Sequence, residues 1–241
     1  MPFRGSVTLI RRIRRITDPG NSVRDSKCRT IGLFHEDRKD LVGMTEQQSP
    51  RGSRIPLARD VPSFLLRFEK QRIDHWACRY SYPQEDVIVA EIAPRVRSIG
   101  YLSKADFMAL CRWKTPRTEP MCDSNDEDFI KEVTNTALST PNEQLRIEVL
   151  TLLRGVGWPT ASVILHFGYD NLYPILDYRA LWSVGVDEPP SQYSFKFWRA
   201  YSQFCRTLAA DCCVAMRTLD RALWQYAKEK QGADGTSEAT P

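Results

Sequence analysis

The chain of 241 residues lacks the features that mark several large protein classes. It has no apolar run close to the roughly 20 residues that span a bilayer, and no uninterrupted apolar core of a secretion signal at its N-terminus. Its seven cysteines are odd in number and include no Cys-x-x-Cys pair, so neither a disulfide framework nor a zinc knuckle is indicated. We therefore expect a cytoplasmic protein with reduced thiols, no bound metal and no membrane partner.

Strand alternation, internal repeats and histidine clusters are also missing. His75 and His166 each stand alone in helical sequence, without a carboxylate or cysteine at a spacing that would indicate a metal site or a triad, so we interpret them as ordinary core or surface residues. Apolar residues recur instead at helical spacing. The sequence predicts an all-α fold.

The formal net charge of +4 is unevenly placed along the chain. Residues 1–60 hold 13 Lys and Arg against 7 Asp and Glu, whereas residues 61–241 hold 21 against 23. Residues 1–60 have no sustained apolar period, which predicts a disordered basic extension; the alternative is a basic arm that adds nonspecific DNA affinity. Residues 61–231 are expected to form the helical domain, and residues 232–241 a disordered tail.

Capping residues and apolar stripes place the expected helices. A stripe from Phe64 to Trp76 predicts the first helix, and Pro94 should kink or shorten the second, which Gly100 closes. Ser103 is a candidate N-cap. Capping boxes begin at Ser124 and at Thr140, and the second is strengthened by Pro141 at the first helical position. The later helices are expected at residues 104–113, 125–138, 141–153, 178–184, 194–210 and 216–230.

The stretch from Leu152 to Arg179 carries the strongest pattern. Gly155-Val156-Gly157 follows a helix end and precedes a second helix, and glycine tolerates the positive φ that a tight interhelical turn needs. The free amides and the dipole at the start of that second helix form a seat for an anion such as a DNA phosphate. After a loop, Asp177 opens a third helix.

This order of features resembles the helix-hairpin-helix DNA glycosylase superfamily, whose signature is Leu-x-Gly-Val-Gly-x-x-Thr-Ala, a loop and a catalytic aspartate. The matching residues run from Leu153 to Ala161, within a hairpin at 144–168 and a catalytic loop at 169–179. Asp177 falls where the family places its aspartate. The resemblance implies a monomeric, two-lobed helical bundle that binds double-stranded DNA between its lobes and flips a base out of the duplex.

The same resemblance implies the chemistry. A fixed carboxylate, Asp177, would stabilise oxocarbenium charge on the sugar while water hydrolyses the N-glycosidic bond and leaves an abasic site. Aspartate is also a common helix N-cap, and both roles can hold at once. Bifunctional family members carry a lysine directly before the hairpin Thr, and here that residue is Pro159, so we expect no AP-lyase activity.

The family also sets expectations for cofactors. Some of its members carry a C-terminal iron-sulfur cluster held by four regularly spaced cysteines, which Cys205, Cys212 and Cys213 do not supply. We therefore expect no cofactor apart from a monovalent cation at the hairpin, as in the family.

Two further sets of residues are candidates for the site. The expected DNA-binding residues are Arg154, Gly155, Val156, Gly157, Trp158, Thr160 and Arg179. The residues expected in the base pocket or in contact with DNA are Tyr178, Trp113, Arg112 and Lys114. Among large aromatics, candidates both for the pocket and for the core are Trp76, Tyr80, Tyr82, Trp113 and Trp182.

Three functions from different classes compete. The first is a monofunctional DNA glycosylase, acting in base excision repair or in defence against phage DNA with modified bases. The second is a non-catalytic helix-hairpin-helix DNA-binding protein, which would need the hairpin but not Asp177. The third is a structural or interaction protein that only retains the fold. One sequence does not define the pocket, so alkylated purines, deaminated or oxidised pyrimidines and bulky modified cytosines all remain candidate substrates.

Overall fold

The computed structural model describes residues 62–170 and 172–231, all within one structural unit that covers residues 55–241. The predictions for residues 1–60 and 232–241 lie outside the described residues. Every regular element within the described ranges is helical, which confirms the all-α prediction. The α-helices are α1 (Ile73–Cys78), α2 (Glu85–Val87), α3 (Ala93–Ile99), α4 (Lys104–Lys114), α5 (Glu119–Asp123), α6 (Glu127–Ser139), α7 (Glu143–Glu148), α8 (Trp158–Gly168), α9 (Tyr178–Ser183), α10 (Phe195–Asp211) and α11 (Met216–Lys230).

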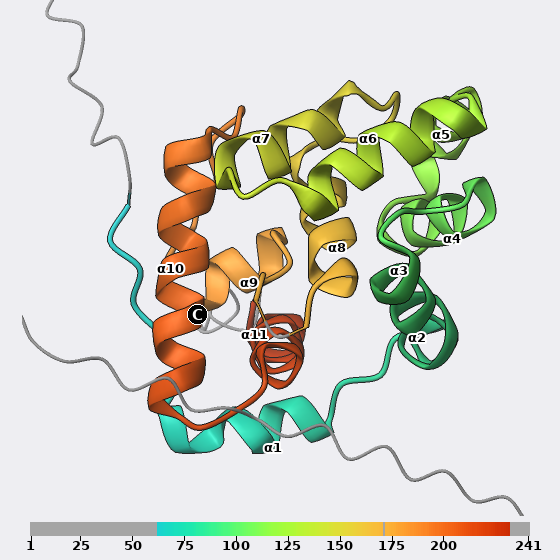
Figure 1. Ribbon diagram of the computed structural model, residues 1–241. Coiled ribbons are helices and arrows are strands. Elements are labelled where there is room, and N and C mark those ends of the chain that lie inside the picture. Colours follow the sequence, from blue (N-terminus) through green and yellow to red (C-terminus); the bar gives the residue numbers. More distant parts are fainter. Residues whose placement is uncertain (1–61, 171, 232–241) are drawn as a thin grey trace, which may run out of the picture. The chain divides into compact units, whose positions relative to one another are not determined.

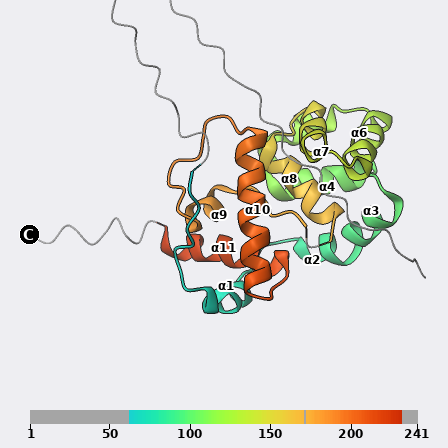
Figure 2. The same cartoon turned by 60° about the vertical axis from the view of Figure 1, so that its left-hand side comes forward.

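The helices pack as two groups (Figure 1). The first combines the two ends of the described chain, because α1 and α9 both pack against α11, and α10 contacts α11 as well (Figure 2). The second group, α2 to α8, comes from the middle of the chain. Two groups of this kind match the expected division of the bundle into two lobes.

Helix α8 lies at the centre of the second group and contacts α3, α4, α6 and α7. It is buried over most of its length, from Thr160 to Phe167. A helix that is enclosed on several sides cannot be amphipathic in the usual way, and this explains its almost wholly apolar sequence. The hairpin turn before α8 is therefore held on a rigid, buried element.

The predicted first helix is wrong over its first half. Residues 62–66 have no regular secondary structure, a short 3-10 turn covers Lys70–Arg72, and only Ile73–Cys78 is α-helical. The segment is held by backbone bonds from the amides of Leu65 and Arg67 to carbonyls at the C-terminal end of α9. Phe64 packs there on three aromatic rings of α10, so tertiary contacts overrode the helical stripe.

Pro94 does not shorten the second helix. The helical stretch runs from Glu85 to Ile99, and a π-helical stretch, Ile88–Ile92, precedes the proline at the start of α3. The wider π turn accommodates a proline that could not donate an ordinary α-helical hydrogen bond. Gly100 closes the helix in the left-handed conformation, as predicted (φ 80°).

Of the caps predicted at Ser103, Ser124 and Thr140, the first is confirmed, and the other two are wrong by two residues. Ser103 caps α4 by accepting the Asp106 amide hydrogen (3.2 Å). The cap of α6 is Asp126, which accepts from the amide of Asp128 (2.9 Å), so Ser124 is not the cap residue. The cap of α7 is Asn142, which accepts from the Leu145 amide (3.0 Å), and not Thr140. The helix then tightens into a 3-10 turn, Val149–Leu152, before the hairpin. The three C-terminal helices begin and end within one residue of their predicted bounds.

Candidate active site

The hairpin turn between residues 153 and 157 approaches α5 so closely that only glycine fits at its centre. Gly155 has φ 80°, and a Cβ added there would lie 2.6 Å from the Cys122 sulfur. The Val156 side chain is buried, and its amide donates to the Leu153 carbonyl (3.1 Å). Because that amide is used inside the turn, Gly155 and Gly157 offer the amides that can face a phosphate.

Asn125 braces this turn from the second helical group, a role that the sequence did not reveal. Its side-chain oxygen accepts from the Arg154 amide (2.8 Å), and its side-chain nitrogen donates to the Arg154 carbonyl (3.0 Å). Asn125 is itself buried. The backbone of Arg154 is thus fixed while its side chain stays exposed beside the turn.

The first turn of α8 has donors to offer. Gly157 is its N-cap and has no side chain to bond the first amides, and the helix is 11 residues long. Trp158 is half-buried against the core, where it lies 6.5 Å from the Trp198 ring. Thr160 is buried (2% exposed) but lines the groove described below. The amides of this first turn, which no side chain caps, are the donors that the expected anion seat would use.

Asp177 lies at the N-terminus of α9 with both carboxylate oxygens bonded. Oδ1 accepts from the Arg179 amide (2.9 Å), so Asp177 is the N-cap of α9, as the structural reading of this residue predicted. Oδ2 accepts from the Lys114 ammonium (2.7 Å). The Asp177 side chain is 17% exposed and the Lys114 side chain 11%. Lys114 comes from the C-terminus of α4, in the other helical group.

This environment keeps Asp177 ionised. Burial raises its pKa, but the charge and hydrogen bond of Lys114, together with the Arg179 amide, outweigh burial and hold the pKa below the usual range for aspartate. A carboxylate that stays charged in a partly dry site can stabilise positive charge on a bound sugar.

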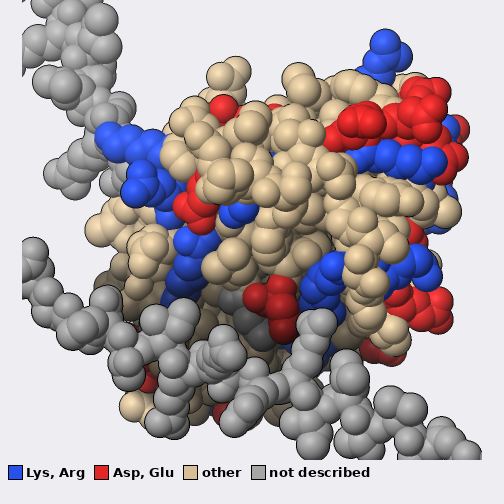
Figure 3. All heavy atoms as spheres, viewed as in Figure 1, with Lys and Arg blue, Asp and Glu red and all other residues tan. Residues whose placement is uncertain are grey.

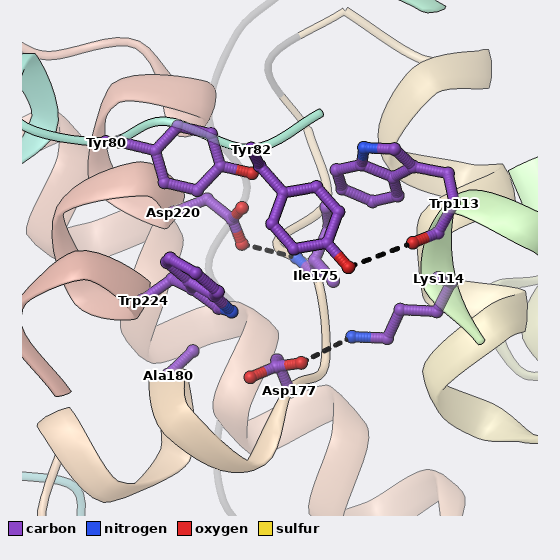
Figure 4. A pocket seen from close by; sticks show the side chains of 9 residues that line it. All are labelled: Tyr80, Tyr82, Trp113, Lys114, Ile175, Asp177, Ala180, Asp220 and Trp224. Carbon is purple, nitrogen blue, oxygen red and sulfur yellow. Dashed lines mark hydrogen bonds and ion pairs between the residues drawn. The ribbon is translucent and has the colours of Figure 1, made fainter. Parts of the chain in front are cut away.

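A small, mainly aromatic cavity of about 40 Å³ opens beside Asp177 (Figure 4). Its lining is Tyr80, Tyr82, Trp113, Lys114, Ile175, Asp177, Ala180, Asp220 and Trp224. The Tyr82 side chain is 37% exposed, and its ring is steeply inclined to the rings of Trp113 (72°) and Trp224 (87°). Its hydroxyl donates one long hydrogen bond to the Trp113 carbonyl (3.4 Å). A cavity of this size holds about one water molecule, so a planar base can enter only if Tyr82 or a neighbour moves.

A wider groove of about 560 Å³ runs from the same carboxylate to the hairpin. It is lined by the segment after α4, including Arg117, by Gly155 and Gly157 of the turn, and by Tyr178. Asp177 and Lys114 belong to both hollows. The two residues therefore stand where the groove meets the cavity.

The remaining predicted residues divide between the site and other surroundings. Tyr178 is half-exposed in the groove, and the guanidinium of Arg179 lies over both the Tyr178 ring (5.2 Å) and the Trp224 ring (5.0 Å). Arg112 points elsewhere, because it is paired with Glu119 (2.5 Å). Trp76 and Trp182 pack on Tyr226 in the core and do not line the cavity.

The two isolated histidines behave as predicted. His75 is exposed, and His166 is buried with Nδ1 bonded to the Tyr173 carbonyl (2.7 Å). Burial, followed by the charge of Arg217, lowers the pKa of His166 to about 3. Within the described ranges no group of three or more Cys, His, Asp or Glu is arranged to hold a metal, and no helix there is long and apolar enough to cross a membrane.

Asp220 and Trp224 of α11 are site residues that the sequence interpretation missed. They stand four residues apart on one face of α11, directed at the cavity (Figure 4). Nothing in their local sequence distinguishes them from other residues of an amphipathic helix.

The surface charge is mixed in sign on the face shown in Figure 3, where acidic and basic side chains lie among one another and do not form two separate patches.

Comparison with known proteins gives one similarity. No family model and no curated protein matches the sequence. Among solved structures, the chain is similar to an 8-oxoguanine glycosylase/lyase from Methanocaldococcus jannaschii in complex with a 15mer DNA containing 8-oxoguanine. The sequences are 17% identical, the match covers 67% of this chain and 82% of that chain, and the TM-score is 0.39. At that score, the similarity by itself assigns no activity to this chain.

Proposed function

We propose that this protein is a DNA glycosylase in which Asp177 assists hydrolysis of the bond between a base and its sugar. The observation that carries the proposal is the position of Asp177 at the junction of the groove and the aromatic cavity. A nucleotide whose phosphates lie in the groove would bring its sugar to the carboxylate and its base into the cavity. This is the arrangement that an enzyme acting on an extruded base requires.

The hairpin would hold the phosphate on one side of that nucleotide. The amides of Gly155 and Gly157 are set by a rigid turn, and Arg154 and Arg117 lie exposed at the turn and along the groove. Contacts of this kind would give DNA binding that weakens as salt rises. DNA is thus the proposed partner, with the duplex opened at one base.

A monovalent cation at the hairpin is part of the proposal, held by backbone carbonyls of the turn. The carbonyls of Leu153 and Arg154 each accept one hydrogen bond, which leaves each of them one further lone pair for a cation. Such a cation would add positive charge next to a bound phosphate.

Base release by water, without strand cleavage, is the second part of the proposal. Pro159 occupies the position of the family's lyase lysine, and the Lys114 amine, although close to Asp177, donates a hydrogen bond to it as an ammonium group. An ammonium group has no lone pair with which to attack the sugar. Borohydride should therefore trap no covalent enzyme–DNA adduct, and an adduct that disappears in Lys114→Met would identify Lys114 as the nucleophile instead.

The central experiment compares wild-type protein with Asp177→Asn on duplex DNA that carries damaged or phage-type modified bases. We expect alkali-labile sites with the wild type, a loss of at least about 100-fold in base release with the variant, and unchanged DNA binding in a filter assay. The asparagine keeps the oxygen that caps α9 but leaves Lys114 without its ion-pair partner, so thermal unfolding of the variant is measured alongside activity to show that it is folded. DNA binding without base release by either protein would favour the non-catalytic alternative.

The bases released also assign the biological role. Release of alkylated, deaminated or oxidised bases indicates repair, whereas release of bulky modified cytosines indicates defence against phage DNA. Mass spectrometry of the released bases distinguishes these outcomes.

A further inference from the structure

The aromatic cavity contains a second carboxylate that base hydrolysis by Asp177 alone does not use. Asp220 is 6% exposed and lines the cavity from α11. Its Oδ1 accepts from the Ile175 amide (3.1 Å), and its Oδ2 accepts from Arg217 Nη1 (2.5 Å). Each oxygen keeps a further lone pair on which a proton can reside. Figure 4 shows the Asp220 and Asp177 carboxylates at different levels of the cavity, with Trp224 on one side and Lys114 on the other.

The two carboxylates occupy different positions relative to the groove. Asp177 lines both the groove and the cavity, whereas Asp220 lines only the cavity. If the sugar of an extruded nucleotide lies at Asp177, its base must extend inward between the aromatic rings, toward Asp220. The inner carboxylate would then face an edge of the base, and the outer one the sugar.

Their surroundings also push their proton affinities apart. Burial raises the pKa of Asp220 to about 6, and the charge of Asp177 adds to that effect, while Arg217, Lys114 and the Ile175 amide oppose it. The pKa of Asp177 is held low, as described above. The other ionisable groups around Asp220 are Tyr80 from the loop after α1, and Tyr201 and Cys205 from α10. A carboxyl pair with one member ionised and the other able to carry a proton near neutral pH is suited to two different catalytic roles.

We propose that Asp220 is the general acid that protonates the departing base. This inference rests on the proposed glycosylase function. As the bond between C1′ and the base nitrogen breaks, its electron pair goes to the base, and a proton passes from the Asp220 carboxyl to a nitrogen or oxygen of the base. Water then adds its oxygen to C1′, where Asp177 has stabilised the positive charge, and the proton that the water loses returns to Asp220.

A proton donor defines the class of substrate. A neutral base leaves as an anion unless it is protonated, whereas a cationic N-alkylated purine leaves as a neutral molecule and needs no acid. The charges of the cavity point the same way, because Asp177 is paired with Lys114 and Asp220 with Arg217. Neither carboxylate is therefore an unpaired negative charge that would attract a cationic base. The substrate is therefore a neutral modified base.

The test is single-turnover base release from duplexes that carry uracil, hypoxanthine, 8-oxoguanine, 5-hydroxymethylcytosine or, as the cationic probe, 7-methylguanine. We expect the wild type to release at least one neutral base, with a rate that falls as pH rises above about 6. Asp220→Asn, which can still accept from the Ile175 amide, should slow that release about 100-fold and remove the fall with pH.

Three results would overturn the inference. The first is an Asp220→Asn variant with the wild-type rate and pH profile on neutral bases. The second is preferential release of 7-methylguanine by the wild type, or an equal slowing of 7-methylguanine and neutral bases in the variant. The third is a wild-type rate on neutral bases that does not fall with pH, a measurement that needs no variant to fold. Release of no base from any duplex would instead refute the proposed function, and this inference with it.

Discussion

The ion pair between Lys114 and Asp177 makes a quantitative prediction about stability. Its atoms are 2.7 Å apart and its side chains are 11% and 17% exposed, so most of the water that would screen the charges is excluded. Lys114→Met removes the ammonium group and keeps most of the apolar stem. The variant leaves Asp177 buried, charged and bonded only to the Arg179 amide.

The expected cost follows from that geometry. Two unit charges 4 Å apart interact by about 4 kcal/mol at the effective dielectric constant of sites near a protein surface. Removing one partner of a fully buried pair costs about 3–5 kcal/mol, and because this pair keeps some exposure we expect about 2 kcal/mol for Lys114→Met near neutral pH. In the double variant with Asp177→Asn no charge is left unpaired, so the double-mutant cycle should give a coupling energy of about 1–2 kcal/mol.

The sign of the pH dependence separates this explanation from simple loss of packing. In the wild type, the folded-state pKa of Asp177 lies below its unfolded value, so the pair stabilises the fold above the unfolded pKa and that contribution is lost as pH falls through the folded pKa. In Lys114→Met, burial is no longer opposed by the ammonium charge and raises the pKa of Asp177. The deficit of the variant should therefore grow as pH rises toward neutral and shrink at acid pH.

Urea unfolding followed by circular dichroism, at several pH values from mildly acidic to neutral, measures both quantities. A coupling energy near zero, or a deficit of Lys114→Met that is independent of pH, would refute the argument. Either result would mean that Lys114 acts through the packing of its stem and not through charge.

Three further predictions concern the turn and the core. Gly155→Ala should lower the free energy of unfolding by about 2–4 kcal/mol, because it combines a positive φ with a Cβ placed 2.6 Å from the Cys122 sulfur. Gly157→Ala, whose Cβ would meet only Pro159 at 3.7 Å, is the matched control in thermal unfolding. Equal losses of stability in the two variants would contradict this account. Asn125→Ala removes both bonds to the Arg154 backbone, so it should lower the free energy of unfolding by about 2 kcal/mol and weaken DNA binding. The control Asn135→Ala, which loses one exposed bond to Gly100, should do neither. Unchanged DNA affinity in Asn125→Ala would show that the turn keeps its shape without these two bonds. Because burial lowers the pKa of His166 to about 3, the unfolded state binds a proton that the folded state does not, and stability should be lost as pH falls below about 6.5. His166→Gln should flatten this pH dependence, and His75→Gln should leave it unchanged. Urea unfolding at several pH values measures both.

Local chemistry explains which parts of the fold could be predicted from the sequence. The cap at Ser103 and the left-handed Gly100 act within a few residues of themselves, so their sequence neighbours define them. The segment around Phe64 could not be predicted in this way. Its spacing fits a helix, but the Phe64 ring contacts three aromatic rings of α10, more than 130 residues further along the chain. The backbone of the segment also bonds to the C-terminal end of α9.

The candidate site, like the fold, could be predicted from the sequence only in part. The hairpin and Asp177 belong to one short stretch whose pattern is readable, whereas the cavity is assembled from elements that meet only in the folded chain. Lys114 was a candidate for DNA contact from its basic surroundings, but its pairing with Asp177, 63 residues away, depends on the tertiary fold that brings the end of α4 near the start of α9. Asp220 and Trp224 lie on the helix that closes the cavity from the other group.

The capping and catalytic interpretations of Asp177 describe one geometry. A carboxylate has about four lone-pair sites, and the Arg179 amide and the Lys114 ammonium occupy one on each oxygen. The cap therefore fixes the orientation of the carboxylate without using up its capacity to meet a sugar or a water molecule. The same geometry makes asparagine a fair replacement, since its oxygen can keep the cap while the charge is lost. If Asp177→Asn folds, binds DNA and still releases bases at the wild-type rate, the cap is the whole role of this residue.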